Sequence, residues 1–103
     1  MADVVKSYRG VKIRLTDERW AHITEEHSEL AGMRFDVLET VSQPRGIYQG
    51  GLGESIAVKE IEAGKFLIVI YREDETDGFI ITAFITRRSN LFERRNLIWS
   101  PSK

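Results

Sequence analysis

The strongest constraint on the fold is a succession of short apolar runs, separated by brief turns, in the second half of the chain. The runs are GIYQ, SIAVKEI, FLIVIYR and FIITAFIT, at 46–49, 55–61, 66–72 and 79–86. Their β-branched and aromatic residues favour strands. Because the turns between them are short, consecutive strands are expected to pair antiparallel. The sequence therefore predicts a four-stranded antiparallel meander.

Helical spacing dominates the first half of the chain. Alternating apolar residues predict a short strand at about 11–15, and Thr16 then offers an N-cap oxygen for a helix over about 17–28. A second apolar stripe predicts a helix over about 35–42, which ends before Pro44. The expected fold is α+β, with two N-terminal helices packed on one face of the four-stranded antiparallel meander sheet.

The pairing of the last two predicted strands sets which residues face the helices. If Glu73 lies opposite Gly78, the even-numbered residues of 66–70 face the helices. The odd-numbered residues then line an open, mixed face together with Thr82. A two-residue loop at Ala63 and Gly64 would place Lys59 with Ile68 on the helix-covered side. Because a buried unpaired lysine is costly, we prefer a bulge or a longer loop, which brings Lys59 to the open face.

Composition limits the class of protein without naming a function. The 103 residues fit a single domain over 1–103, with its core at about 11–99. Fifteen basic and sixteen acidic residues give a net charge of −1, so the overall charge provides no general attraction for nucleic acid. Residues 87–95, however, hold four arginines and one acid. The chain has no cysteine and no apolar run of transmembrane length. We expect a cytoplasmic protein with no membrane partner.

The two histidines are the side chains best suited to proton transfer near neutral pH. His22 and His27 lie about 140° apart on an ideal helix. They can share one site only if that site wraps the helix or the helix ends near His27. The alternatives are a core histidine bonded to backbone for His27 and a simple exposed position for His22. The stretch HITEEH lacks the HExxH spacing, so we expect no metal.

Hydroxyl and cationic side chains on the predicted strands are the other candidates. Thr82 near Tyr71 and Lys59 could bind a phosphate, although threonine is also simply a good strand former. Arg72 and Arg87 lie at strand ends, where guanidinium groups either bind phosphate or form a solvated rim. No glycine-rich phosphate loop opens a helix.

The order of these motifs resembles a known group of nucleases. R-W-A-H-I and E-H-S-E-L in the first helix are followed by Q-P-R, V-K, L-I-V-I-Y-R and I-I-T-A-F. This layout, over about 11–99, is similar to the Barnase–EndoU–colicin–RelE-like nuclease families of phages and mobile elements, and to bacterial domain families of the same arrangement. The families' usual R-H-P-E is here Glu26, His27 and Ser28 followed by Glu29.

The resemblance implies a metal-independent, toxin-like or effector-like ribonuclease without a cofactor. Its site residues would be His22, His27 and Thr82 as catalytic groups. The substrate-binding residues, from the resemblance and from the residue types together, would be Lys59, Arg72, Tyr71 and Arg87. Expected partners are RNA and an antitoxin-like protein.

The alternative function is a non-catalytic protein-interaction module of a bacterial family. In that case the mixed sheet face would bind a protein. The chain could also form a homodimer by strand addition at an edge strand near Trp99.

Overall fold

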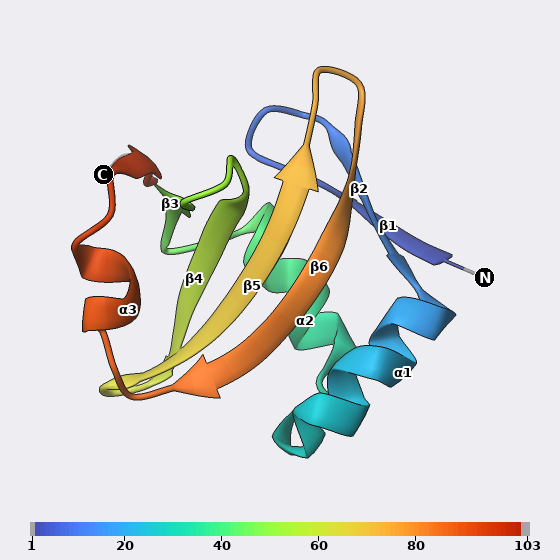
Figure 1. Cartoon of the computed structure of the whole chain (residues 1–103), viewed down its shortest axis with the longest axis horizontal. Helices are drawn as coiled ribbons and strands as arrows, with labels where there is room; N and C mark the ends of the chain where they lie inside the picture. Colours follow the sequence, from blue (N-terminus) through green and yellow to red (C-terminus); the bar gives the residue numbers. More distant parts are fainter. Residues whose placement is uncertain (1, 102–103) are drawn as a thin grey trace.

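A computed structural model describes residues 2–101 as one mixed seven-stranded sheet with three α-helices (Figure 1). The strand order across the sheet is β1-β2-β6-β5-β4-β3-β7. In chain order the elements are β1 (Ala2–Lys6), β2 (Lys12–Thr16), α1 (Asp17–Glu26), the 3-10 helix η1 (Ser28–Leu30), α2 (Arg34–Ser42), β3 (Gly46–Gln49), β4 (Ser55–Glu62), β5 (Lys65–Glu73), β6 (Asp77–Thr86), α3 (Asn90–Glu93) and β7 (Leu97–Trp99).

The prediction of a four-stranded antiparallel sheet with two N-terminal helices is wrong. Strands β3 to β6 do pair antiparallel in chain order, but β2 extends this group by pairing parallel with β6. β1 then pairs with β2, and β7 pairs with β3. The parallel contact joins segments more than 60 residues apart, and local periodicity carries no signal for such a pairing. The α+β class itself is correct.

The helices begin close to where the sequence places them, but α1 ends earlier. The Thr16 hydroxyl accepts the backbone N–H of Arg19 at 3.0 Å, as expected of an N-cap. α1 stops at Glu26, and His27 is its C-cap with φ −132° and ψ 73°. This non-helical residue therefore points its side chain in a direction that helical spacing does not give.

A β-bulge changes which residues of β6 lie on each face of the sheet. Glu73 pairs with Gly78 as expected, but the register shifts between Ile70 and Tyr71, so that Ile70 pairs with Thr82 and Tyr71 pairs with Ile80. The extra residue lies in β6. The unbroken register expected from Glu73 and Gly78 would pair Ile70 with Ile81, and that expectation is wrong.

The helix-covered face is the opposite of the predicted one. The odd-numbered β5 side chains Leu67, Val69 and Tyr71 are fully buried in the same core as Ile23 of α1 and Val37 of α2. Figure 1 shows α2 behind the central strands. The even-numbered side chains face the other way, and we call the side of the sheet opposite α2 the open face.

Part of the open face is covered by α3. Phe92 of α3 is 3% exposed and packs with Ile56, Phe66 and Ile68 in a second, smaller core. Its ring centroid lies 5.1 Å from that of Tyr48 and 5.2 Å from that of Phe66. A sheet with apolar residues on both faces is typical of strands that are covered on both sides.

The free edge of β6 lies beside α1. β2 pairs only with residues 77–79 of β6, and its chain then turns into α1. Figure 1 shows α1 beside the second half of β6, where no neighbouring strand continues. One flank of α1 therefore lies along the side chains of β6. Across residues 2–101, none of the helices has the length and apolar character needed to cross a membrane.

Candidate active site at the free edge of β6

A hollow of about 530 Å³ lies between α1 and the free edge of β6, and we call it the histidine hollow. α1 and its C-cap supply one wall and β6 supplies the other. The lining residues are Arg19, His22, Ile23, Glu26, His27, Ile81, Thr82 and Phe84. Both histidines and Thr82, which the sequence singles out as catalytic candidates, therefore lie in a single hollow.

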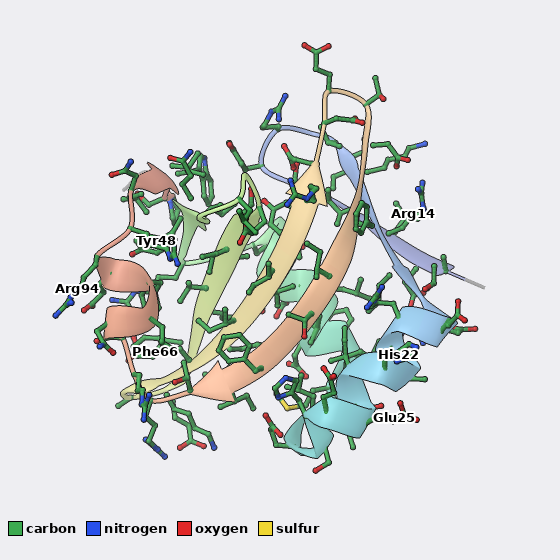
Figure 2. All side chains as sticks on the ribbon, in the orientation of Figure 1. Arg14, His22, Glu25, Tyr48, Phe66 and Arg94 are labelled. Carbon is green, nitrogen blue, oxygen red and sulfur yellow. The ribbon has the colours of Figure 1, made fainter. Side chains whose placement is uncertain are left out.

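The end of α1 allows both imidazoles to line the same hollow. Continued helix would separate His22 and His27 by about 140° around the axis. Because the helix ends at Glu26, the His27 ring instead turns toward β6 and lies against Phe84, with ring centroids 5.9 Å apart and an interplanar angle of 36°. The His27 ring thus lies against β6. His22 stays on the helix (Figure 2).

Both imidazoles are accessible to a ligand. The His22 side chain is 65% exposed and that of His27 is 33% exposed. Each has a carboxylate near Nδ1, Glu25 at 3.9 Å for His22 and Glu29 at 3.7 Å for His27. These separations are longer than a hydrogen bond. Neither ring is a sealed core histidine, so both are available for proton transfer.

Thr82 and Arg19 bring a hydroxyl and a guanidinium to the same hollow. Within residues 2–101 neither side chain has a hydrogen bond or an ion pair to another residue. Sequence reasoning missed Arg19, although it precedes His22 by three residues and Glu26 by seven, which places all three on one helix face. That spacing is the signal that could have found it.

The four predicted substrate-binding residues lie outside this hollow. Tyr71 is fully buried in the helix-covered core, and burial raises the pKa of its hydroxyl above the usual range. Lys59 shares that face and forms an ion pair with Glu39 of α2, which explains how a half-buried lysine is tolerated. Arg87 is exposed beyond the end of β6, and Arg72 lies near the other end of that strand.

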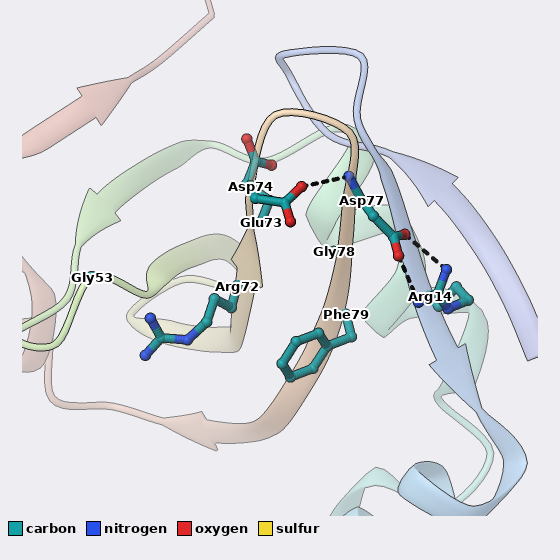
Figure 3. Close-up of a pocket in the computed structure, with 8 residues that line it drawn as sticks. All are labelled: Arg14, Gly53, Arg72, Glu73, Asp74, Asp77, Gly78 and Phe79. Carbon is teal, nitrogen blue, oxygen red and sulfur yellow. Dashed lines mark hydrogen bonds and ion pairs between the residues drawn. The ribbon is translucent and has the colours of Figure 1, made fainter.

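A second hollow of about 450 Å³ surrounds the β5–β6 turn, and we call it the hairpin hollow (Figure 3). It contains Arg72 and the exposed ring of Phe79. The Asp77 carboxylate accepts two hydrogen bonds from the Arg14 guanidinium, at 2.7 and 2.8 Å. Those hydrogen bonds hold the pKa of Asp77 below its usual range.

The other acids of the hairpin hollow are also bound to the protein. Asp74 Oδ1 accepts the backbone N–H groups of Thr76 and Asp77 at 2.8 and 2.9 Å, which lowers the pKa of Asp74. Glu73 accepts a hydrogen bond from Arg9 at 2.8 Å. These carboxylates therefore hold the turn and the neighbouring loop in place.

No set of three or more His, Cys, Asp or Glu side chains converges as a metal site in the part of the chain that the structure describes. No protein-family model, curated protein or solved structure matches the chain. The candidate site therefore depends on the geometry of the histidine hollow.

Proposed function

We propose that the protein is a metal-independent endoribonuclease whose catalytic groups line the histidine hollow. The observation that carries this proposal is the convergence of two accessible imidazoles and the Thr82 hydroxyl on one hollow. Two imidazoles can act as a base and an acid in the same reaction. RNA supplies its own nucleophile, the ribose 2′-hydroxyl, so the site needs no nucleophilic side chain.

The reaction would be an in-line transesterification. One imidazole removes the 2′-hydroxyl proton as the 2′-oxygen forms a bond to the adjacent phosphorus. The other imidazole gives its proton to the 5′-oxygen as the phosphorus–oxygen bond to the next nucleotide breaks. The products are a 2′,3′-cyclic phosphate and a free 5′-hydroxyl, and the two histidines have exchanged protonation states.

Charge that develops on the phosphate would be stabilised by Arg19 and Thr82. A guanidinium donates two parallel hydrogen bonds to phosphate oxygens, and a hydroxyl donates a third. Neither group is used elsewhere in residues 2–101. Arg19 thus takes the role that the sequence assigned to Lys59, Arg72 and Arg87.

The test is cleavage of single-stranded RNA in the presence of EDTA. We expect wild type to yield cyclic phosphate ends and Thr82→Val to be slower by about 10²–10³, as for loss of one transition-state donor. Thr86→Val is the matched control, because Thr86 lies four residues further along β6 and outside the hollow. Equal rates for wild type and Thr82→Val would remove the hydroxyl from the mechanism, and lack of RNA cleavage by wild type would remove the proposed function.

The alternative, a non-catalytic interaction module, is favoured by one observation. β7 is an edge strand of the sheet, with Leu97 and Ile98 53% and 43% exposed. Such an edge can pair with a second copy of the chain or with an antitoxin-like protein. A concentration-dependent dimer that Ile98→Lys dissociates, together with no RNA cleavage, would favour this function over the nuclease.

A further inference from the structure

The α3 segment, residues 87–95, carries four exposed arginines and one glutamate, which give it a net charge of +3. Within residues 2–101 none of these guanidinium groups has a hydrogen bond or an ion pair to another residue. By contrast, four arginines elsewhere in the chain form ion pairs with carboxylates, namely Arg9, Arg14, Arg34 and Arg45. The unpaired charge of the α3 segment is therefore open to an external anion.

Two of these arginines, Arg94 and Arg95, line a polar hollow of about 280 Å³, which we call the arginine hollow. The backbone N–H of Gln49 in β3 donates to the carbonyl oxygen of Asn96 at 2.9 Å. The backbone N–H of Arg95 donates at 2.9 Å to the carbonyl oxygen of Phe92, whose side chain is buried. The backbone that carries both guanidinium groups is thus anchored to the sheet and to α3.

The neighbouring carboxylates leave these guanidinium groups free. Glu54 and Arg95 both line an apolar groove of about 180 Å³ between α3 and the open face. Oε1 of Glu54 accepts the backbone N–H of Leu52 at 2.8 Å, and within residues 2–101 neither Glu54 nor Glu93 forms an ion pair with an arginine. A guanidinium with free N–H groups donates two parallel hydrogen bonds to a phosphate.

The arginine hollow and the histidine hollow are joined along the open face. Phe84 lines both the histidine hollow and the apolar groove, and Arg95 lines both the groove and the arginine hollow. Figure 2 shows His22 and Arg94 on opposite flanks of the molecule. The sheet order from β6 through β5 and β4 to β3 spans about 14 Å, at about 4.8 Å between neighbouring strands. At about 3.4 Å per nucleotide of a stacked strand, this distance corresponds to about four nucleotides.

We infer that the α3 segment binds backbone phosphates of a single-stranded RNA whose cleaved phosphodiester lies in the histidine hollow. This inference rests on the proposed function and names its substrate class, a strand of about four or more nucleotides. Contacts to phosphates position a strand without reading its sequence. Arg94 and Arg95 lie far from the imidazoles, so they should lower KM for long strands and leave kcat unchanged.

The first experiment measures binding without cleavage, by fluorescence anisotropy with a fully 2′-O-methylated RNA of about twelve nucleotides, which lacks the 2′-hydroxyl nucleophile. The double variant Arg94→Gln/Arg95→Gln should weaken binding roughly tenfold at low salt. Its plot of log affinity against log salt concentration should be shallower by about 1.4, at about 0.7 for each lost phosphate contact.

The matched control is Lys6→Gln/Lys12→Gln, which removes two charges from exposed, paired positions of β1 and β2 at the opposite edge of the sheet. Its salt dependence should equal that of wild type. All four substituted residues are exposed, so both double variants should keep the wild-type melting temperature.

The second experiment compares cleavage of an unmodified RNA of the same length with cleavage of a dinucleotide. The double arginine variant should raise KM for the long RNA without changing kcat, and it should change neither constant for the dinucleotide, which cannot reach the α3 segment. An equal rise of KM for both substrates would overturn the inference.

The outcomes separate the α3 segment from the nuclease. An unchanged salt dependence in the arginine variant, or an equal loss of affinity in the lysine variant, would overturn the inference while RNA cleavage by the histidines still stands. Arginine-dependent binding of the methylated strand, without cleavage of unmodified RNA by wild type, would support the binding surface and overturn the proposed function. Tighter binding of a poly-glutamate peptide of equal length would assign the surface to an acidic protein and overturn the inference.

Discussion

The hollows at the two ends of β6 have similar volumes but differ in whether their polar side chains are bound by the protein itself. In the hairpin hollow the carboxylates of Asp74 and Asp77 are bound by backbone N–H groups and by Arg14. In the histidine hollow Thr82 and Arg19 have no such partners within residues 2–101. Polar groups that the fold already satisfies stabilise it, whereas accessible groups without partners are free to meet a ligand.

The pairing of β6 explains the difference. Its first residues, 77–79, lie between β5 and β2, and the salt bridge from Arg14 crosses to this part of the strand. The later residues have a free edge, which α1 approaches with a different set of side chains. One end of β6 thus contributes to the stability of the fold, and in our proposal the other end contributes to catalysis.

The largest expected effect is the loss of either imidazole. His22→Ala and His27→Ala should each lower the RNA cleavage rate by about 10²–10⁴, the range for general acid or base catalysis. Asp77→Asn in the hairpin hollow should leave the rate per folded molecule unchanged. Single-turnover assays with folded protein quantified by circular dichroism would check this, and a strong rate loss in Asp77→Asn would break the comparison between the hollows.

One arginine in each hollow, Arg19 and Arg72, gives a sharper version of the comparison. Arg19→Gln should slow cleavage by about 10²–10³, because one donor to the transition-state phosphate is lost. Arg72→Gln, an equal change of charge in the hairpin hollow, should have a much smaller effect that disappears at high salt. Measuring kcat and KM for both at two salt concentrations tests this, and equal losses would show that only net charge matters.

A smaller effect, on the stability of the fold, is expected from a substitution at Gly78 in the hairpin hollow. A Cβ at Gly78 would lie 2.5 Å from the Arg72 carbonyl oxygen and 2.6 Å from Cδ1 of Ile13. Gly78→Ala should therefore lower the free energy of unfolding by about 1–3 kcal/mol, as for overpacking. Urea unfolding measures this change. Wild-type stability in the variant would contradict the tight packing of the turn.

The smallest effect concerns pH. The hydrogen bonds from Arg14 lower the pKa of Asp77, so this ion pair stabilises the fold above the usual pKa of an aspartate, and the contribution is lost as the pH falls through the pKa of Asp77 in the folded protein. The stability difference between wild type and Asp77→Asn should be small, because the pair is exposed, and should vanish in acid. Unfolding curves from pH 3 to pH 7 would show it; a difference that grows in acid would contradict this sign.

The sequence predicts those parts of the fold that depend on local pattern. The Thr16 cap, the four central strands and the starts of α1 and α2 all follow from residues within a few positions. The parallel pairing of β2 with β6 and the bulge beside Ile70 depend on distant segments, and the bulge places Thr82 and Phe84 on the same face as Ile70 and Ile68. Periodicity alone could not reveal either.

The candidate site shows the same division. His22, His27 and Thr82 are chosen by residue chemistry, and their convergence depends on α1 ending at Glu26, which the sequence placed two residues later. Lys59 and Tyr71 were chosen by the same chemical reasoning, but they face the helix-covered core. Residue type identifies groups that can react, and only the topology decides which of them meet.

A double-mutant cycle in RNA cleavage tests the shared histidine hollow most directly. The rates of wild type, His22→Ala, His27→Ala and the double variant would be compared on one single-stranded RNA in EDTA. If the two imidazoles serve one reaction, the double variant should be little slower than either single variant. Cleavage that persists at the wild-type rate in either single variant, or losses that simply multiply, would contradict a common site.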